Sequence, residues 1–139
     1  MASTPLAGGC LCGSVRFEVT EPLTLAGYCH CTRCQRRTGT GASISAFVPA
    51  RSLRVLSGAQ QIRCWQPPDG SAKCFCSACG AHLWARIAEE GPHFVRFGAF
   101  DTDPVVRPSY RQFVASAPPW EPVPDDGLER FPAARPAHP

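Results

Sequence analysis

The sequence lacks any run of about 18 apolar residues, so it predicts no membrane-spanning helix. Long helices are also disfavoured, because 15 prolines and 12 glycines interrupt a chain of 139 residues. Motifs for acyl transfer (G-x-S-x-G), phosphate loops and dinucleotides (G-x-G-x-x-G) are absent, so those chemistries have no support. The first residues have neither the basic nor the apolar region of a signal peptide, and we therefore expect a cytoplasmic protein.

Cysteine, in contrast, is abundant. The chain has nine cysteines, and an odd number cannot all pair as disulfides within one chain. Two explanations compete: a disulfide scaffold in an oxidising compartment, or metal ligands in a reducing one. Spacing favours metal ligands, because seven of the nine fall into C-x-C, C-x-C-x-x-C and C-x-x-C clusters. These seven are Cys10, Cys12, Cys29, Cys31, Cys34, Cys76 and Cys79.

Short stretches of alternating apolar and polar residues predict a mainly β domain. In the first of them, Val15, Phe17 and Val19 are expected to face the core. The polar run 35–40 predicts either a turn of helix or a loop. The expected strands span residues 14–19, 44–48, 52–56, 61–65, 72–75, 81–86, 93–97 and 110–115.

Both ends of the chain are expected to lack regular structure. Residues 1–9 read as a short leader that frays. From Pro104 onward nine of the 15 prolines appear, which predicts an extended proline-rich tail with Trp120 and Phe131 as its apolar anchors. We therefore expect one domain over residues 8–132 and a disordered tail over 133–139.

The two outer pairs of cysteines predict one closed metal site. Cys10 and Cys12 lie far in sequence from Cys76 and Cys79, as a staple between two hairpins requires. Four thiolates complete the tetrahedron around Zn²⁺, so we expect this zinc to be structural. The alternative, four buried free thiols, does not explain two matched pairs.

The middle cluster, Cys29, Cys31 and Cys34, predicts a different metal site. Three thiolates leave a tetrahedral Zn²⁺ one ligand short, and catalytic zinc sites keep such a position for water or substrate. Zinc lowers the pKa of a bound thiol and holds the thiolate ready as a nucleophile, so the vacancy suits a substrate thiol. The alternative is a second structural zinc, with His30, His82 or a distant cysteine as its fourth ligand.

Three arginines, Arg33, Arg36 and Arg37, flank the middle cluster. Because a guanidinium binds carboxylates with a planar fork, they could bind an acidic thiol peptide; a solvated basic turn is the alternative. His30 could transfer a proton at neutral pH, or it could only hydrogen-bond near the ligands. His82, next to the last cysteine pair, has the same two interpretations.

Cys64 and Cys74 fit no cluster. We expect Cys74 to be a small buried side chain, with a spare metal ligand as the alternative.

The net charge of +3 does not indicate nucleic-acid binding. Seven ligating thiolates would subtract seven charges and two Zn²⁺ ions would return four, which brings the sum to zero. Nucleic-acid binding usually needs a basic stripe with aromatic residues between the charges. We therefore expect no nucleic-acid partner.

Three segments resemble the glutathione-dependent formaldehyde-activating enzyme family, which also includes centromere protein V. They are GCLCGSVRF at 9–17, CHCTRCQRRTG at 29–39 and FCSACGAHL at 75–83, and the likeness extends over nearly all of residues 8–132. The resemblance implies a small zinc-stapled β-tent fold with short strands and tight turns. It also implies a structural zinc on the outer four cysteines and a labile, catalytic zinc on the middle three.

The resemblance further implies an activity. Members of the family join glutathione and formaldehyde into S-hydroxymethylglutathione, which is formally a carbon–sulfur lyase reaction in reverse. A small-molecule thiol and an aldehyde would then be the partners, with Zn²⁺ as cofactor and glutathione as co-substrate. By position in the motif, the catalytic residues would be Cys29, Cys31, Cys34 and His30, and the glutathione-binding residues Arg33, Arg36, Arg37, Thr38 and Gly39.

Two other functions stay open at this point. One is a non-enzymatic zinc module that binds protein or nucleic acid. The other is a degenerate family member, in which the middle site is empty or two of its cysteines are oxidised to a disulfide.

Overall fold

The computed structural model describes residues 5–136 and confirms the mainly β fold: within them lie eleven strands and one α-helix. The chain divides into two compact units. Unit 1 comprises residues 1–24 and 45–106, and unit 2 comprises residues 25–44 and 107–139. In the described part of the chain, no helix has the length and apolar character needed to cross a bilayer.

Unit 1 contains a three-stranded antiparallel sheet in the order β1-β2-β5. Its strands are β1 (Leu6–Gly9), β2 (Arg16–Val19) and β5 (Leu53–Ser57). The expected alternation on the second strand is confirmed, because Val15, Phe17 and Val19 are all fully buried. The leader prediction is wrong for β1, since Leu6 is buried and the strand pairs with β2 along its whole length.

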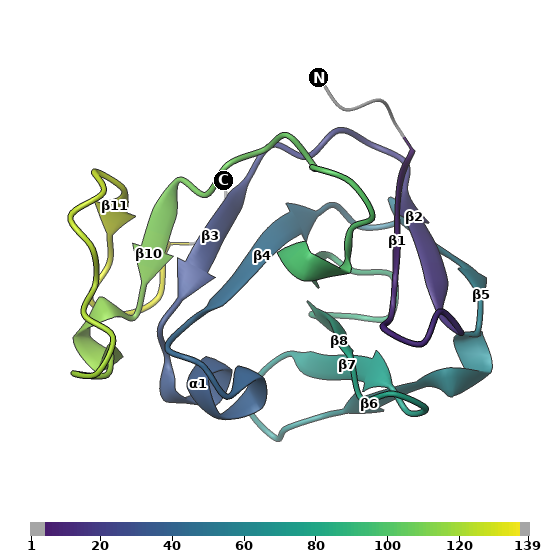
Figure 1. Ribbon diagram of the computed structural model, residues 1–139, viewed down its shortest axis with the longest axis horizontal. Helices are drawn as coiled ribbons and strands as arrows, with labels where there is room; N and C mark the ends of the chain where they lie inside the picture. Colours follow the sequence, from purple (N-terminus) through teal and green to yellow (C-terminus); the bar gives the residue numbers. More distant parts are fainter. Residues whose placement is uncertain (1–4, 137–139) are drawn as a thin grey trace. The chain divides into compact units, whose positions relative to one another are not determined.

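The longer antiparallel series of unit 1 runs in the order β4-β9-β8-β7-β6, which leaves β6 as an edge strand (Figure 1). All five strands were expected, to within a residue or two at their ends. Their bounds are β4 (Ser43–Val48), β6 (Ile62–Trp65), β7 (Ala72–Cys76), β8 (His82–Arg86) and β9 (His93–Arg96).

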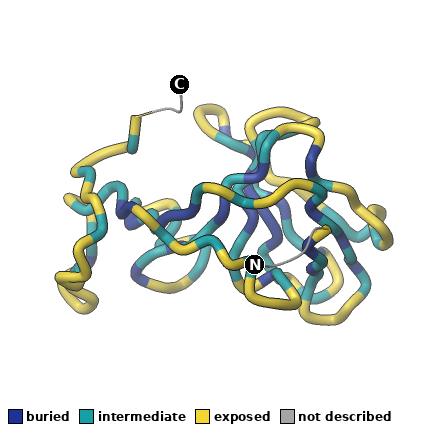
Figure 2. Tube along the Cα trace, turned by 90° about the horizontal axis from the view of Figure 1, so that it is seen from above, coloured by how far each residue is buried: buried dark blue, intermediate teal, exposed yellow. Residues whose placement is uncertain are grey.

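The core of unit 1 is built around Phe17. Its ring meets Trp84 edge-on, with centroids 5.4 Å apart, and packs against Phe100 at 6.0 Å. Such edge-to-face aromatic pairs add to the hydrophobic effect of burial. The turns between the strands are largely exposed (Figure 2).

Unit 2 is smaller and holds the only α-helix of the described residues. The parallel strands β3 (Ala26–Cys29), β10 (Tyr110–Gln112) and β11 (Glu129–Arg130) lie side by side, with β10 in the middle. Gly27 faces Tyr110 across the strand pair, and an added Cβ would stand 2.3 Å from that ring. The tyrosine ring thus lies where only glycine leaves room for it. Helix α1 (Thr32–Thr38) follows β3 after two residues.

The second half of unit 2 differs in part from the expected tail. The strand expected at 110–115 ends at Gln112, and a 3₁₀ turn follows at Val114–Ser116. Phe131 is confirmed as an anchor, because its ring packs on Tyr110. Trp120 is not an anchor, since 67% of its surface is exposed.

The domain limits stay a prediction. Residues 133–136, expected to be disordered, are described by the structure, and the Ala133 carbonyl accepts a hydrogen bond from the N–H of Phe113. Residues 137–139 lie outside the described residues.

Candidate metal centres

Four cysteines of unit 1 come together at the ends of two tight turns. Cys10 and Cys12 lie between β1 and β2, and Cys76 and Cys79 lie between β7 and β8. Each turn closes with a glycine in the left-handed region, with φ near 80° in both cases, where residues with a Cβ are strained. The glycine N–H groups donate back to the carbonyls of Cys10 and Cys76. These glycines are Gly13 and Gly80.

The four sulfur atoms of this cluster fit a tetrahedral metal ion. All four lie within 4.8 Å of one another, with 3.6 Å from Cys10 to Cys12 and 4.0 Å from Cys12 to Cys76. A ZnS₄ tetrahedron with bonds of about 2.3 Å has sulfur–sulfur edges of about 3.8 Å. The donor set and its spacing therefore suit a closed zinc site, as the sequence predicts.

The surroundings favour the thiolate form at Cys10 and Cys76. At Cys12 the hydroxyl of Ser14 acts to lower the pKa, but the sulfurs of Cys10 and Cys79 outweigh it and raise this pKa. Burial acts to raise the pKa of Cys10, but the N–H of Val15 and the hydroxyl of Ser14 outweigh it and bring this pKa down to about 6. The same hydroxyl lies 3.1 Å from the sulfur of Cys12 and 3.5 Å from that of Cys76, and it lowers the pKa of Cys76. The hydroxyl of Ser14 thus contacts three of the four sulfurs of this cluster, and the sequence did not predict this role.

The three cysteines of the middle cluster are gathered by one strand end and one helix start in unit 2. Cys29 ends β3, Cys31 is the N-cap of α1, and Cys34 lies in the first helical turn. The N–H of Cys34 donates to the Cys31 sulfur at 3.3 Å, which is the capping bond of the helix. The three sulfurs lie within 4.8 Å of one another, and no fourth His, Cys, Asp or Glu of residues 5–136 joins this group.

The three sulfurs share negative charge unequally. Hydrogen bonds from Cys29 and Cys34, together with backbone N–H groups at the helix start, lower the pKa of Cys31 to about 2. The same sulfur contacts, and burial, raise the pKa of Cys29. A cluster that holds a thiolate at Cys31 fits a bound cation, and three sulfurs supply one ligand fewer than tetrahedral zinc takes.

His30, between the first two of these cysteines, is buried and held by Arg111. The guanidinium places Nη1 3.2 Å from Nε2 of His30 and donates to Oδ2 of Asp126 through Nε and Nη2, at 3.1 and 2.8 Å. It also stacks on the ring of Tyr28 at 3.9 Å. Because arginine can only donate, Nε2 of His30 is the acceptor and the proton of the neutral ring is on Nδ1. Burial, and then Arg111, lower the pKa of His30.

Arg111 is the residue that sequence reasoning missed. Its only signal is a charged residue in the middle of an expected strand, yet 7% exposure makes it one of the few buried polar side chains of the described residues. Its partner Asp126 lies 15 residues further on, in the proline-rich segment. No spacing rule links the two to His30.

The residues around α1 divide into two groups. Arg33, Arg36 and Arg37 stand at i, i+3 and i+4, and therefore share one side of the helix. Arg33 and Arg36 are exposed, whereas Arg37 is half-buried. Thr38 and Gly39 end the helix: the hydroxyl of Thr38 donates to the Cys34 carbonyl at 2.7 Å, and Gly39 takes the left-handed C-cap conformation.

The remaining candidates lie outside both cysteine clusters. His82 begins β8 in unit 1 and joins neither group of ligands among the described residues. Cys64 and Cys74 form a disulfide between β6 and β7, which was not predicted. Cys74 is buried as expected, but as one half of this disulfide and not as a spare metal ligand. The two strands pair these cysteines directly, with Cα atoms 4.1 Å apart. Clustering by sequence spacing cannot find such a pair, because strand register decides it.

Comparison with known proteins agrees with the cysteine pattern. The family model described as glutathione-dependent formaldehyde-activating enzyme matches residues 5–116. A curated relative from Penicillium rubens is 30% identical over 82% of this chain, and one from Podospora anserina is 28% identical over 77%. Both are named putative glutathione-dependent formaldehyde-activating enzyme. The matches span 64% and 53% of the relatives' own lengths, so this chain spans just over half to two thirds of them.

A solved structure shows the same fold. The crystal structure of a Rhodobacter sphaeroides protein, a structural genomics target, has a TM-score of 0.59 and 25% identity to this chain. The likeness covers 91% of this chain and 99% of that one. Since the family model also covers well over half of the sequence, the chain belongs to the glutathione-dependent formaldehyde-activating enzyme family.

Proposed function

We propose that this chain is a zinc-dependent enzyme of carbon–sulfur bond chemistry, which adds a glutathione-like thiol to an aldehyde at the three-cysteine site. One observation carries the proposal: three sulfurs converge there without a fourth ligand from residues 5–136, whereas four converge in unit 1. Family membership supports glutathione and formaldehyde as the substrates. The four-cysteine site would hold a structural zinc that takes no part in turnover.

The chemistry needs a thiolate held at a fixed place. A zinc ion bound by Cys29, Cys31 and Cys34 would supply a Lewis acid that lowers the pKa of a substrate thiol. The sulfur lone pair then forms the carbon–sulfur bond to the carbonyl carbon. The π electrons move to the carbonyl oxygen, which takes a proton from water, while the thiol proton has been released. The reverse sequence is the lyase reaction.

The arginine side of α1 is the proposed binding surface for the thiol substrate. Glutathione carries two carboxylates, and guanidinium groups bind carboxylates through paired hydrogen bonds. Arg33 and Arg36 are exposed and lie within one helical turn of Cys34. Thr38 and Gly39 support this surface by ending the helix, and we assign them that indirect role.

The Arg111 contact restricts what His30 can do. Its Nε2 accepts from Arg111, so any hydrogen bond that the ring donates comes from Nδ1. That atom is buried. We propose that His30 fixes the path of the chain between Cys29 and Cys31, and that a donated hydrogen bond from Nδ1 is its only direct role. The proposal places the protein in the cytoplasm, where glutathione is the main thiol buffer.

Zinc stoichiometry of the reduced protein, with and without glutathione, tests the proposal. We expect two zinc ions per chain, of which a chelator removes one readily, and slower removal when glutathione is present. Turnover is followed by NMR as formation of the hydroxymethyl thioether from ¹³C-formaldehyde. A single tightly held zinc, or no thioether above the uncatalysed rate, would contradict an enzymatic role. Strongly salt-dependent DNA binding would instead support a non-enzymatic zinc module.

A further inference from the structure

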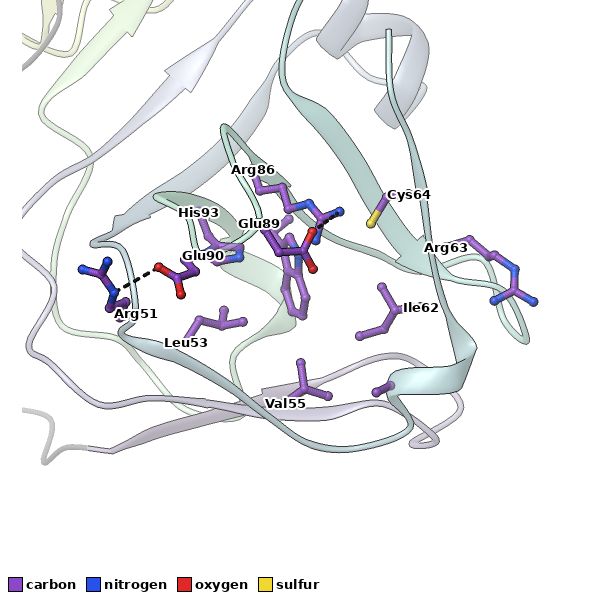
Figure 3. Close-up of a pocket in the computed structure, with 12 residues that line it drawn as sticks. Arg51, Leu53, Val55, Ile62, Arg63, Cys64, Arg86, Glu89, Glu90 and His93 are labelled. Carbon is purple, nitrogen blue, oxygen red and sulfur yellow. Dashed lines mark ion pairs between the residues drawn. The ribbon is translucent and has the colours of Figure 1, made fainter.

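A cavity lies within unit 1, lined by residues that are remote in sequence from the middle cysteine cluster. Its volume is about 640 Å³, in the usual range for small-molecule pockets. Its apolar lining comes from Leu53 and Val55 of β5, from Ile62 of β6 and from Trp84 of β8. Figure 3 shows the first three of these beside the charged residues of the cavity. None of the seven cysteines of the two metal clusters lines this cavity.

The disulfide lies in the wall of this cavity. Strand register places Cys64, Cys74 and Trp84 in one row across β6, β7 and β8, so their side chains share a face of the sheet. Cys64 and Trp84 both line the cavity, and Cys64 is exposed. Cys74 has no exposed surface. Cys64 is therefore exposed in the cavity wall, whereas its partner Cys74 is covered.

Accessibility decides which sulfur is attacked. In thiol–disulfide exchange a thiolate attacks one sulfur and displaces the other, and the rate depends on access to the attacked sulfur. Cys64 lies on the edge strand β6 and lines the cavity, so a thiol held there can reach it, with Cys74 as the leaving group. Cys74 is fully buried on β7, which disfavours attack at that sulfur.

The charged residues of the cavity suggest which thiol would enter. Arg51 pairs with Glu90 at 3.0 Å, and Arg86 pairs with Glu89 at 3.3 Å (Figure 3). Both glutamates are well exposed, at 64% and 86%, whereas Arg86 is only 26% exposed. Exposed ion pairs are weak, so a ligand carboxylate can replace a glutamate at either guanidinium. Apolar walls and replaceable carboxylates suit a small thiol with an acidic group.

We propose that this cavity binds an anionic low-molecular-weight thiol of the glutathione class and exchanges it with the Cys64–Cys74 disulfide. The incoming thiolate forms a bond to Sγ of Cys64, the Cys64–Cys74 bond breaks, and Cys74 leaves with the electron pair as a thiolate that takes a proton. A second thiol can then release Cys64 and leave as the oxidised dimer of the thiol. The disulfide itself is the oxidant, and the site is independent of the proposed zinc chemistry.

Peptide mapping tests the regiochemistry. The oxidised, metal-loaded protein is treated with limiting glutathione, quenched with acid and alkylated. We expect glutathione on Cys64 and the alkyl group on Cys74. Glutathione on Cys74, or opening of the disulfide only under denaturing conditions, would overturn the proposal. So would Cys64 and Cys74 that stay free thiols in the folded protein after mild oxidation.

Rates with a charged and an uncharged thiol test the ligand class. The probes are glutathione and its diethyl ester, which has the same thiol but no carboxylates. We expect glutathione to open the disulfide about fivefold faster, as a gain of about 1 kcal/mol would give. Arg86→Gln should remove that preference. Arg54→Gln, on the same strand as Leu53 and Val55 but outside the cavity, should keep it.

Two results of the rate comparison would count against the proposal. Equal rates for glutathione and its diester on the wild-type chain would show that the cavity does not recognise the carboxylates of the thiol. If Arg86→Gln still reacted faster with glutathione than with the diester, the preference for the charged thiol would not come from this cavity. Neither result bears on zinc binding or on thioether formation, so this proposal and the proposed enzymatic function can fail separately.

Discussion

The four-cysteine site of unit 1 and the three-cysteine site of unit 2 are built from the same side chain, but they differ in how far apart their cysteines lie in the sequence. In unit 1 the ligands join two turns that are 64 residues apart between Cys12 and Cys76. In unit 2 all three ligands lie between Cys29 and Cys34, on one strand end and one helix start. A metal that bridges distant strands closes a long loop, so its binding energy becomes folding energy. A metal on a local loop can leave without opening the fold.

The largest effect is expected from breaking the four-cysteine site. Cys10→Ser removes one of the four sulfurs of the proposed structural zinc site, while its hydroxyl can still accept from the N–H of Val15. We expect the loss of a large share of the ~10 kcal/mol that a structural zinc contributes to folding. Urea unfolding followed by fluorescence of the buried Trp84 measures it. A variant within about 1 kcal/mol of wild type would show that this metal does not hold unit 1 together.

Cys31→Ser is the matched substitution in unit 2 and should have the opposite result. Serine is a better N-cap than cysteine, so its hydroxyl can accept from the N–H of Cys34 and keep α1 in place. We expect the unfolding free energy to change by less than about 1 kcal/mol. Thioether formation should fall by at least about 100-fold and zinc content by one ion per chain. Equal loss of stability in Cys31→Ser and Cys10→Ser would contradict the proposal that only the four-cysteine site stabilises the fold.

The contrast between the sites also explains how much the sequence could predict. Cysteines in C-x-C and C-x-x-C spacing are a local signal, so the two groups that the structure brings together were predicted from the sequence. Their role as metal ligands stays a prediction. Strands with one buried face alternate visibly, which is why β2 and the strands of the longer series were found. Residue spacing within a short segment was therefore enough to predict the cysteine clusters, and alternation within a short segment was enough to predict the strands.

Features set by tertiary pairing could not be predicted in the same way. The Cys64–Cys74 disulfide depends on the register between β6 and β7. Strand β1, with the sequence Leu-Ala-Gly-Gly, has no alternation and forms because β2 supplies its hydrogen bonds. Arg111 reaches His30 across 81 residues of sequence. In each case the partner, not the segment itself, determines the structure.

Arg111→Met tests whether the three-cysteine site depends on the buried contact between Arg111 and His30. The variant keeps an apolar chain on Tyr28 but leaves Nε2 of His30 without its donor and Asp126 without its ion pair. We expect unit 2 to lose about 2 kcal/mol and thioether formation to fall about tenfold. Zinc in the four-cysteine site should stay bound. Asp126→Asn is the control, because Arg111 then keeps its contact with His30 and activity should change little.

The smallest effects are expected from one ion pair in each unit. Arg16 lowers the pKa of Asp101 in unit 1, and Arg111 lowers that of Asp126 in unit 2. A lowered carboxyl pKa means that the unfolded chain binds more protons, so each pair stabilises the fold above the unfolded pKa of about 3.9. This stabilisation is lost as the pH falls through the lower, folded pKa. Both contributions are small because water reaches the two carboxylates and screens their charge.

The difference in urea midpoint between wild type and an Asp→Asn variant isolates each pair, since acid also protonates the ligand thiolates in both proteins. Asp101→Asn and Asp126→Asn should be slightly less stable than wild type at pH 7 and equal to it below the folded pKa. For Asp126→Asn the loss should disappear in the Arg111→Met background, because the partner is gone. A gap that stays constant from pH 7 to acid would mean that the carboxylate charge is not what stabilises these contacts.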